Sequence, residues 1–76
     1  MNAVRRKEIS RALEKLEEAK SILEAVKEEE ENAYENLPGG IQDSERGERM
    51  QEAIDSLDSM LDSIDEAIDS ADEIIG

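Results

Sequence analysis

The chain has 76 residues, of which 22 are acidic and 9 basic, so its formal net charge at pH 7 is −13. It contains no cysteine and no histidine, which excludes disulfides, thiolate and imidazole zinc sites, and catalytic dyads or triads built on these side chains. A chain this short forms one domain at most, near the lower size limit for an independent core. We therefore expect a single non-enzymatic domain without a cofactor or metal, stabilised in part by association.

The negative net charge restricts the kinds of molecule that the protein can bind. Excess negative charge is repelled by nucleic acid and by anionic membrane surfaces, so basic or neutral proteins are the expected partners. No run of about 18 apolar residues occurs that could span a membrane, and the basic residues 1–7 are not followed by the apolar segment of a secretory signal. We expect a cytoplasmic protein with no direct nucleic-acid binding and no membrane association.

The first half of the chain has a heptad pattern of apolar residues, recurring at alternating steps of three and four. Position a holds Ile9, Leu16 and Leu23, and Glu30 at the next a position is the one break. Position d holds mostly small residues, which let a neighbouring helix approach closely: Ala12, Ala19, Val26 and Ala33. The pattern predicts a helix over about residues 3–36 that packs through positions a and d, with Leu13, Ile22 and Tyr34 beside that seam.

The second half has a broader apolar arc. Positions a and d are apolar without interruption, at Met50, Ile54, Leu57, Leu61, Ile64, Ile68, Ala71 and Ile75. The neighbouring position g is apolar as well, at Ala53, Met60, Ala67 and Ile74. Two apolar positions per heptad suffice for a pair of helices, whereas three are typical of a helix in a larger bundle. The pattern predicts a helix over about residues 44–75.

Residues 37–43 between the two patterns have the composition of a turn. Pro38 disfavours a helical Leu37, Gly39 and Gly40 permit positive φ, and Asp43 or Ser44 can cap the helix that follows. Two helices of similar length joined by a short turn are expected to fold back on one another. We therefore predict an all-α fold, an antiparallel two-helix hairpin of coiled-coil type.

The charges at the helix ends agree with the antiparallel arrangement. Basic residues open both predicted helices and acidic residues close them, which is unfavourable for each helix dipole alone. When the chain folds back near residue 40, the basic start of the first helix lies beside the acidic end of the second. The acidic segment 28–31 then lies beside Arg46 and Arg49.

The polar positions of the second helix are sorted by type. Aspartate occupies positions b and e on one flank of the apolar arc, at Asp55, Asp58, Asp62, Asp65, Asp69 and Asp72. Serine occupies position c on the other flank, at Ser56, Ser63 and Ser70. Both are indifferent helix formers, so their regular use indicates a role in choosing which flank is covered. We expect the serine flank to accept a neighbouring helix. The aspartate strip is interpreted first as a solvated face that partly neutralises Lys15, Lys20 and Lys27 of the first helix, and alternatively as an acidic partner surface.

The excess apolar surface of the second helix predicts self-association. Two hairpins that cover this surface would form a four-helix bundle, as a homodimer or a higher oligomer. The residues expected to carry the contact are Leu57, Met60, Ile64, Ala67 and Ile74.

The segment around the turn resembles a group of viral proteins. Asn36-Leu37-Pro-x-x-Ile41-Gln42-x-Ser44-Glu45-Arg46, between an acidic helix and repeated Ala-Ile-Asp-Ser-Leu, is similar to small acidic helical proteins of phages and prophages of Gram-positive bacteria. That resemblance covers most of the chain and implies a mobile-element origin, without assigning any residue a role.

Three functions remain open at this point. The first is a non-enzymatic, self-associating helical hairpin that binds a protein partner. The second is mimicry of DNA by the aspartate strip, to inhibit a host DNA-binding or defence protein, and the third is a structural assembly or spacer module. Weak Ca²⁺ or Mg²⁺ binding by paired carboxylates is a further alternative, although the loop of an EF-hand is absent.

Overall fold

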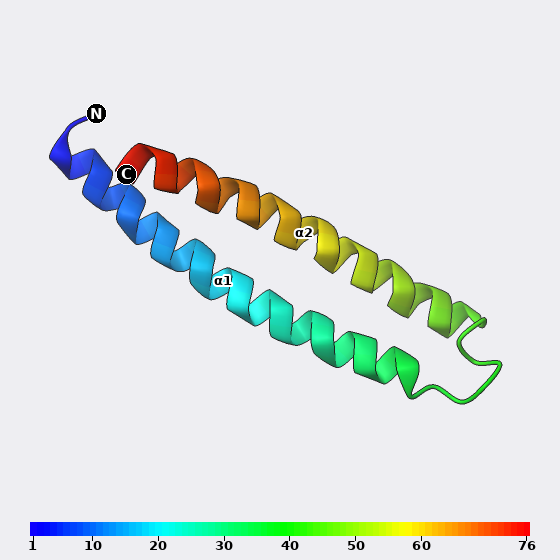
Figure 1. Cartoon of the computed structure of the whole chain (residues 1–76). Coiled ribbons are helices and arrows are strands. Elements are labelled where there is room, and N and C mark those ends of the chain that lie inside the picture. The colour runs from blue at the N-terminus through cyan, green and yellow to red at the C-terminus, as the bar shows by residue number, and fades with distance from the viewer.

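A computed structural model describes all 76 residues and consists of two long helices joined by one turn (Figure 1). Helix α1 runs from Ala3 to Glu35 and helix α2 from Glu45 to Ile75. They lie side by side in opposite directions, so both chain termini are at one end and the turn is at the other. The molecule is a rod of 58 × 14 × 14 Å without strands. The predicted all-α hairpin is confirmed, and each helix is one residue shorter than expected at the turn.

A polar N-cap residue precedes each helix. The Asn2 side-chain oxygen accepts a hydrogen bond of 2.9 Å from the Arg5 amide, and the Ser44 hydroxyl accepts one of 3.4 Å from the Gly47 amide. Both caps satisfy amides that have no partner within the helix. Ser44 also donates to the Ile41 carbonyl. The start of α2 is therefore linked to the turn that precedes it.

The turn is held by its own backbone and by one side chain. The Ile41 amide donates to the Pro38 carbonyl at 3.0 Å, and Gly40 adopts a φ of +89°, which side chains strongly disfavour. The Gln42 side-chain amide donates to the Tyr34 carbonyl at 3.2 Å. That bond ties the turn to the last turn of α1, so both ends of the loop are anchored.

Helix α2 faces α1 through the positions that the heptad pattern predicts. Ile54 and Ala71 are buried, with 6% and 8% of their surface exposed. The other a and d residues from Met50 to Ile75 are half-buried. Gly47, which the pattern did not single out, is the remaining buried residue. The core is therefore a single thin seam between two helices.

Helix α1 is rotated relative to the expectation. Its half-buried residues fall at positions a and e, at Ile9, Leu13, Leu16, Lys20, Leu23, Lys27, Glu30 and Tyr34, with Ser10 and Ala19 beside them. Ala12, Val26 and Ala33, predicted to lie in the seam at position d, are exposed. The predicted position a is therefore confirmed, whereas the prediction of position d is wrong for these three residues. Covering Leu13 and Tyr34 removes more apolar area from water than covering alanine does, which favours the rotated packing.

Two contacts between the helices define their register. Lys20 contacts Asp65 and Lys27 contacts Asp58, and in both pairs the residue numbers add up to 85. Residue n of α1 therefore lies close to the height of residue 85 − n of α2. The relation holds along the seam because both helices have the same rise per residue.

Gly47 is expected to be required for the docking of the turn onto α2. A Cβ atom at this position would lie 2.0 Å from the Gln42 carbonyl oxygen, too close for any adjustment short of a backbone shift. Gly47→Ala should therefore lower the free energy of unfolding by about 1–3 kcal/mol, although glycine to alanine inside a helix ordinarily stabilises. Thermal unfolding followed by circular dichroism measures the change.

Gly39→Ala is the matched control, because a Cβ at Gly39 meets nothing within 4 Å and the φ there is not positive. It should leave the melting temperature unchanged or slightly raised. A Gly47→Ala protein as stable as this control would contradict the close approach of Gln42.

Candidate interaction surfaces

The two helices leave different chemistry on the two long sides of the rod. On one side position e of α1, which holds Leu13, Lys20, Lys27 and Tyr34, meets position e of α2, which holds Asp58, Asp65 and Asp72. On the other side lie the apolar position d of α1 and position g of α2, together with position g of α1, where Ile22 stands between the charged Lys15 and Glu29. We call these the ion-pair side and the apolar side.

Two lysines and two aspartates bridge the helices on the ion-pair side. Lys20 Nζ lies 2.7 Å from Asp65 Oδ1, and Lys27 contacts Asp58 one heptad further towards the turn. The lysine side chains are only 36% and 27% exposed, because their methylene stems lie along the seam. The ion pairs therefore fix the rotation of α1 as well as its register.

Each aspartate changes the titration of the lysine that it contacts. The hydrogen bond to Asp65, together with the negative charge of Asp65, raises the pKa of Lys20 above its ordinary value of 10.5. The hydrogen bond to Asp58 raises the pKa of Lys27 in the same way, against a smaller opposing effect of desolvation. Both lysines therefore hold their protons more firmly in the folded chain.

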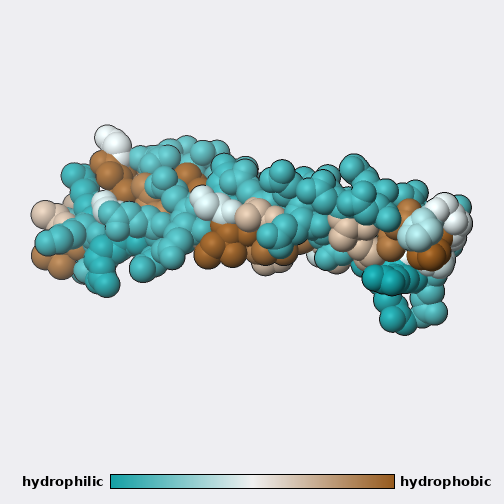
Figure 2. Space-filling model, turned by 90° about the horizontal axis from the view of Figure 1, so that it is seen from below, coloured by the Kyte–Doolittle hydropathy of each residue, from teal (hydrophilic) through white to brown (hydrophobic).

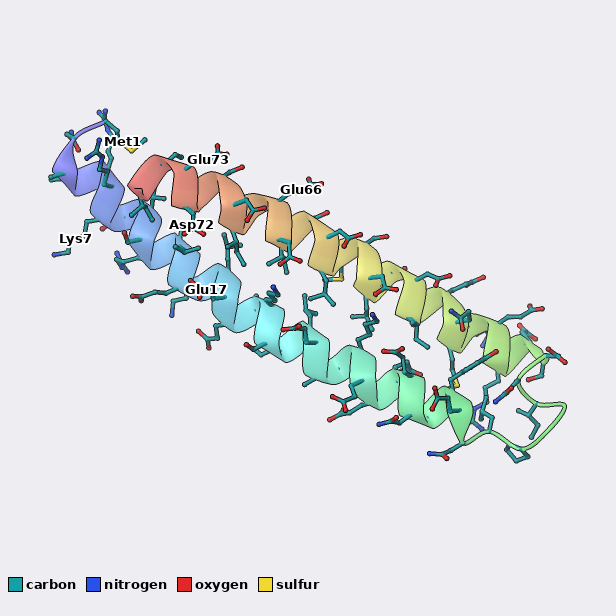
Figure 3. All side chains as sticks on the ribbon, in the orientation of Figure 1. Met1, Lys7, Glu17, Glu66, Asp72 and Glu73 are labelled. Atoms are coloured by element: carbon teal, nitrogen blue, oxygen red, sulfur yellow. The ribbon has the colours of Figure 1, made fainter.

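The remaining aspartates of the predicted acidic surface lie at the edge of the ion-pair side or beyond it. Asp55 accepts a hydrogen bond of 3.2 Å from Gln51 on its own helix, and Asp62, Asp69 and Asp72 are exposed without an ion pair. Asp72 lies along the edge of α2 that borders α1, whereas Glu66 and Glu73 point away from α1 (Figure 3). The structure thus divides the predicted strip into two paired and four unpaired aspartates.

The apolar side carries a row of aliphatic side chains from both helices, which we call the apolar stripe. Its members are Ala12, Ala19, Ile22, Val26 and Ala33 of α1, and Ala53, Met60, Ala67 and Ile74 of α2. Ile22 is 57% exposed, Met60 48%, and Val26 and Ile74 each 42%. Viewed from below the rod, apolar side chains break the hydrophilic surface near the middle and at both ends (Figure 2).

The register places eight of the nine members of the stripe in four layers across the two helices, and Ile22 lies between the second and third layers. From the free end to the turn the layers are Ala12 with Ile74, Ala19 with Ala67, Val26 with Met60, and Ala33 with Ala53. The serines at position c border the stripe on α2 and are exposed. Near the turn the stripe ends in a shallow hollow lined by Arg46, Arg49, Met50, Ala53, Glu30 and Glu45.

The five residues predicted to carry self-association divide between two faces. Leu57 and Ile64 lie on the face of α2 that covers α1, so the hairpin itself already uses them. Met60, Ala67 and Ile74 lie in the apolar stripe. Sequence reasoning placed the α1 half of the stripe, Ala12, Val26 and Ala33, inside the hairpin. The exposure of position d could have been predicted from Leu13 and Tyr34, because these large apolar residues at position e favour burial of e over burial of d.

Neither side carries a cluster of side chains that could ligate a metal ion. The hollows on the ion-pair side are open and lined mainly by polar or charged residues such as Glu17, Lys20 and Glu31. Neither helix has a stretch long and apolar enough to cross a membrane.

The ion pairs are expected to give the protein an alkaline limit of stability. Because the folded-state pKa values of Lys20 and Lys27 are raised, the stabilisation is complete below pH 10.5 and is lost as the pH rises through those higher values. Arginine keeps its charge throughout that range. Between about pH 9 and about pH 11.5, the melting temperature of the double variant Lys20→Arg and Lys27→Arg should therefore fall by less than that of the wild type.

The variant Lys7→Arg serves as the control, since Lys7 contacts neither Asp58 nor Asp65. Its melting temperature should follow that of the wild type. Parallel curves for the wild type and the Lys20→Arg, Lys27→Arg variant would show that the two interhelical pairs do not contribute.

Comparison with known proteins assigns no role to any residue on either side. No family model, no curated protein and no solved structure matches this chain.

Proposed function

We propose that the protein is a non-enzymatic interaction module that works as a self-associated helical hairpin. Two hairpins pack with their apolar stripes facing each other and form a four-helix bundle. The observation that carries this proposal is the apolar stripe, because it recurs at heptad spacing along one side of the rod and leaves four large aliphatic side chains about half exposed. Exposed apolar side chains gathered on one side are typical of an interface.

The thin core of the single hairpin supports the same proposal. Among the apolar residues only Ile54 and Ala71 are buried, and no large side chain is fully buried. Two packed helices of this length expose most of their surface, so the chain buries little apolar area against the entropy of ordering 76 residues. A second copy covers the stripe and gives each hairpin a second packed side. Folding and association are then coupled.

The outer surface of such a bundle is strongly acidic, since each copy contributes a net charge of −13. We propose that it binds a basic or neutral protein partner in the cytoplasm, in a phage or prophage setting. The unpaired row of Asp55, Asp62 and Asp69 faces away from the stripe and stays accessible in the bundle. Such a surface speeds encounter with a positively charged partner.

DNA mimicry is the weaker candidate for the same surface. A mimic needs a regular line of unpaired negative charge, and Asp58 and Asp65 are instead engaged by lysines of the same chain. A spacer function is compatible with the length of the rod, although it gives no reason for the apolar stripe. Self-association explains the stripe, and for that reason we propose it first.

The mass in solution tests this proposal. Light scattering coupled to size exclusion should give a mass of at least twice the 8.5 kDa of one chain. The melting temperature should rise with protein concentration, because association and folding are linked. A monomeric mass with full helicity at all concentrations would contradict self-association.

A pair of neighbouring substitutions gives the matched control. Met60→Asp places a charge in the centre of the stripe and should shift the mass to that of a monomer, with partial loss of helicity. Ser59→Asp adds the same charge at the outward position f beside it and should leave the mass unchanged. Equal effects of the two substitutions would show that total charge, and not burial of the stripe, controls association.

A further inference from the structure

The pattern of sizes and charges along the apolar stripe is asymmetric from one end to the other, so it distinguishes two ways of pairing the hairpins. In a same-end dimer both turns lie at one end, and α1 packs against α2 of the partner. In an opposite-end dimer the turns lie at opposite ends, α1 packs against α1 of the partner, and α2 against α2. Both arrangements keep all neighbouring helices antiparallel, so direction alone does not decide between them.

We infer that the second copy binds in the opposite-end arrangement, with the turn of each hairpin beside the free ends of the other. This inference rests on the proposed self-association and specifies the geometry of that interface. Two features of the molecule support this arrangement: the sizes of the residues in the layers of the stripe, and the charges of the residues beside it.

The layers of the stripe differ in size. The layer of Ala19 and Ala67 is small, and the next layer towards the turn, Val26 and Met60, is large. In the same-end dimer each layer meets its own copy, which leaves a gap at the alanines and crowding at Val26 and Met60. In the opposite-end dimer the two middle layers exchange, so the small layer faces the large one. Interiors are well packed when large and small residues alternate across an interface.

The middle of the stripe lies at Ile22, and two charged residues of α1 lie one heptad to either side of it. These are Lys15 and Glu29, which share position g with Ile22. Lys15 has 81% of its side chain exposed and only a distant contact of 4.0 Å with Glu18, and Glu29 forms no ion pair. Both charges are therefore available to a second copy.

An opposite-end dimer pairs these two charges. When α1 packs antiparallel against α1 of the partner about Ile22, Lys15 lies opposite Glu29 of the partner subunit, and the symmetry creates the pair twice. In the same-end dimer the register sets Lys15 against the partner's Ser70 and Glu29 against the partner's Ser56, which offer no countercharge. Charges that match across an interface select orientation more than they add affinity.

The overall charge distribution favours the same choice. Residues 22–63, which form the turn half of the rod by this register, contain 13 acidic and 3 basic residues, and so carry −10 of the net charge of −13. The free-end half carries the remaining −3. A same-end dimer places the two halves of higher charge together, whereas an opposite-end dimer places each beside a half of lower charge. The repulsion is smaller in the second case.

A distance measurement between the two turns tests the arrangement. The chain has no cysteine, so Gly39→Cys carries a single nitroxide label, at an exposed site where a Cβ meets nothing within 4 Å. Pulsed electron resonance on the dimer should give a separation of about 50 Å, twice the distance from Ile22 to the turn at the helical rise. A same-end dimer would give about 20 Å, the width of two adjacent helices.

The outcomes separate this inference from the proposal beneath it. A monomeric mass with no intermolecular distance would refute self-association, and the inference with it. A dimeric mass with the short separation would refute the opposite-end arrangement while self-association stands. A dimeric mass with the long separation supports both.

A charge exchange tests the pairing of Lys15 with Glu29 of the partner subunit. Lys15→Glu and Glu29→Lys should each weaken dimerisation relative to their controls, by about fivefold, and the double variant should recover most of the loss. The controls Lys7→Glu and Glu28→Lys make the same changes of charge at the outward position f, where Lys7 points away from α2 (Figure 3). Absence of recovery in the double variant would refute the pairing and the opposite-end register.

Discussion

The rotation of α1 about its own axis is the constraint on which the rest of this structure depends. Two contacts, Lys20 with Asp65 and Lys27 with Asp58, hold position e of α1 against α2. Surface ion pairs contribute little energy by themselves. Here Leu13 and Tyr34 share the same position and are drawn into the seam with them. Because charge and apolar burial agree, the helix has one preferred rotation.

The rotation of α1 determines which of its residues are exposed to solvent. With position e turned inward, the alanines and Val26 at position d are turned outward, on the side where α2 presents Ala53, Met60, Ala67 and Ile74. The apolar stripe is thus a product of both helices and exists only at this register. The aspartates and the stripe lie on opposite sides of the rod, so one hairpin can pack against another without bringing its densest charge into the interface.

The larger features of the fold follow from sequence patterns, and the finer ones do not. Heptad spacing, Pro38 with two glycines and the sorted charges are local signals, and they predicted two antiparallel helices and the inward face of α2. The rotation of α1 was missed because positions d and e both carry apolar residues. The choice depends on comparing leucine and tyrosine at e with alanine at d across the partner helix. Gly47 was missed for a similar reason, since only the fold brings Gln42 against it.

The constant register has a consequence for how the length of such a rod can change during evolution. Every heptad adds one layer of the same kind to both sides, about 10.5 Å along the axis. Deletion or duplication of seven residues in α1, together with seven at the matching height of α2, would shorten or extend the rod and keep its two sides distinct. A change of one or two residues in either helix would instead turn the segment beyond it by one or two steps of about 100°. Aspartates would then move towards the stripe, so the length of this hairpin is free to vary only in whole heptads.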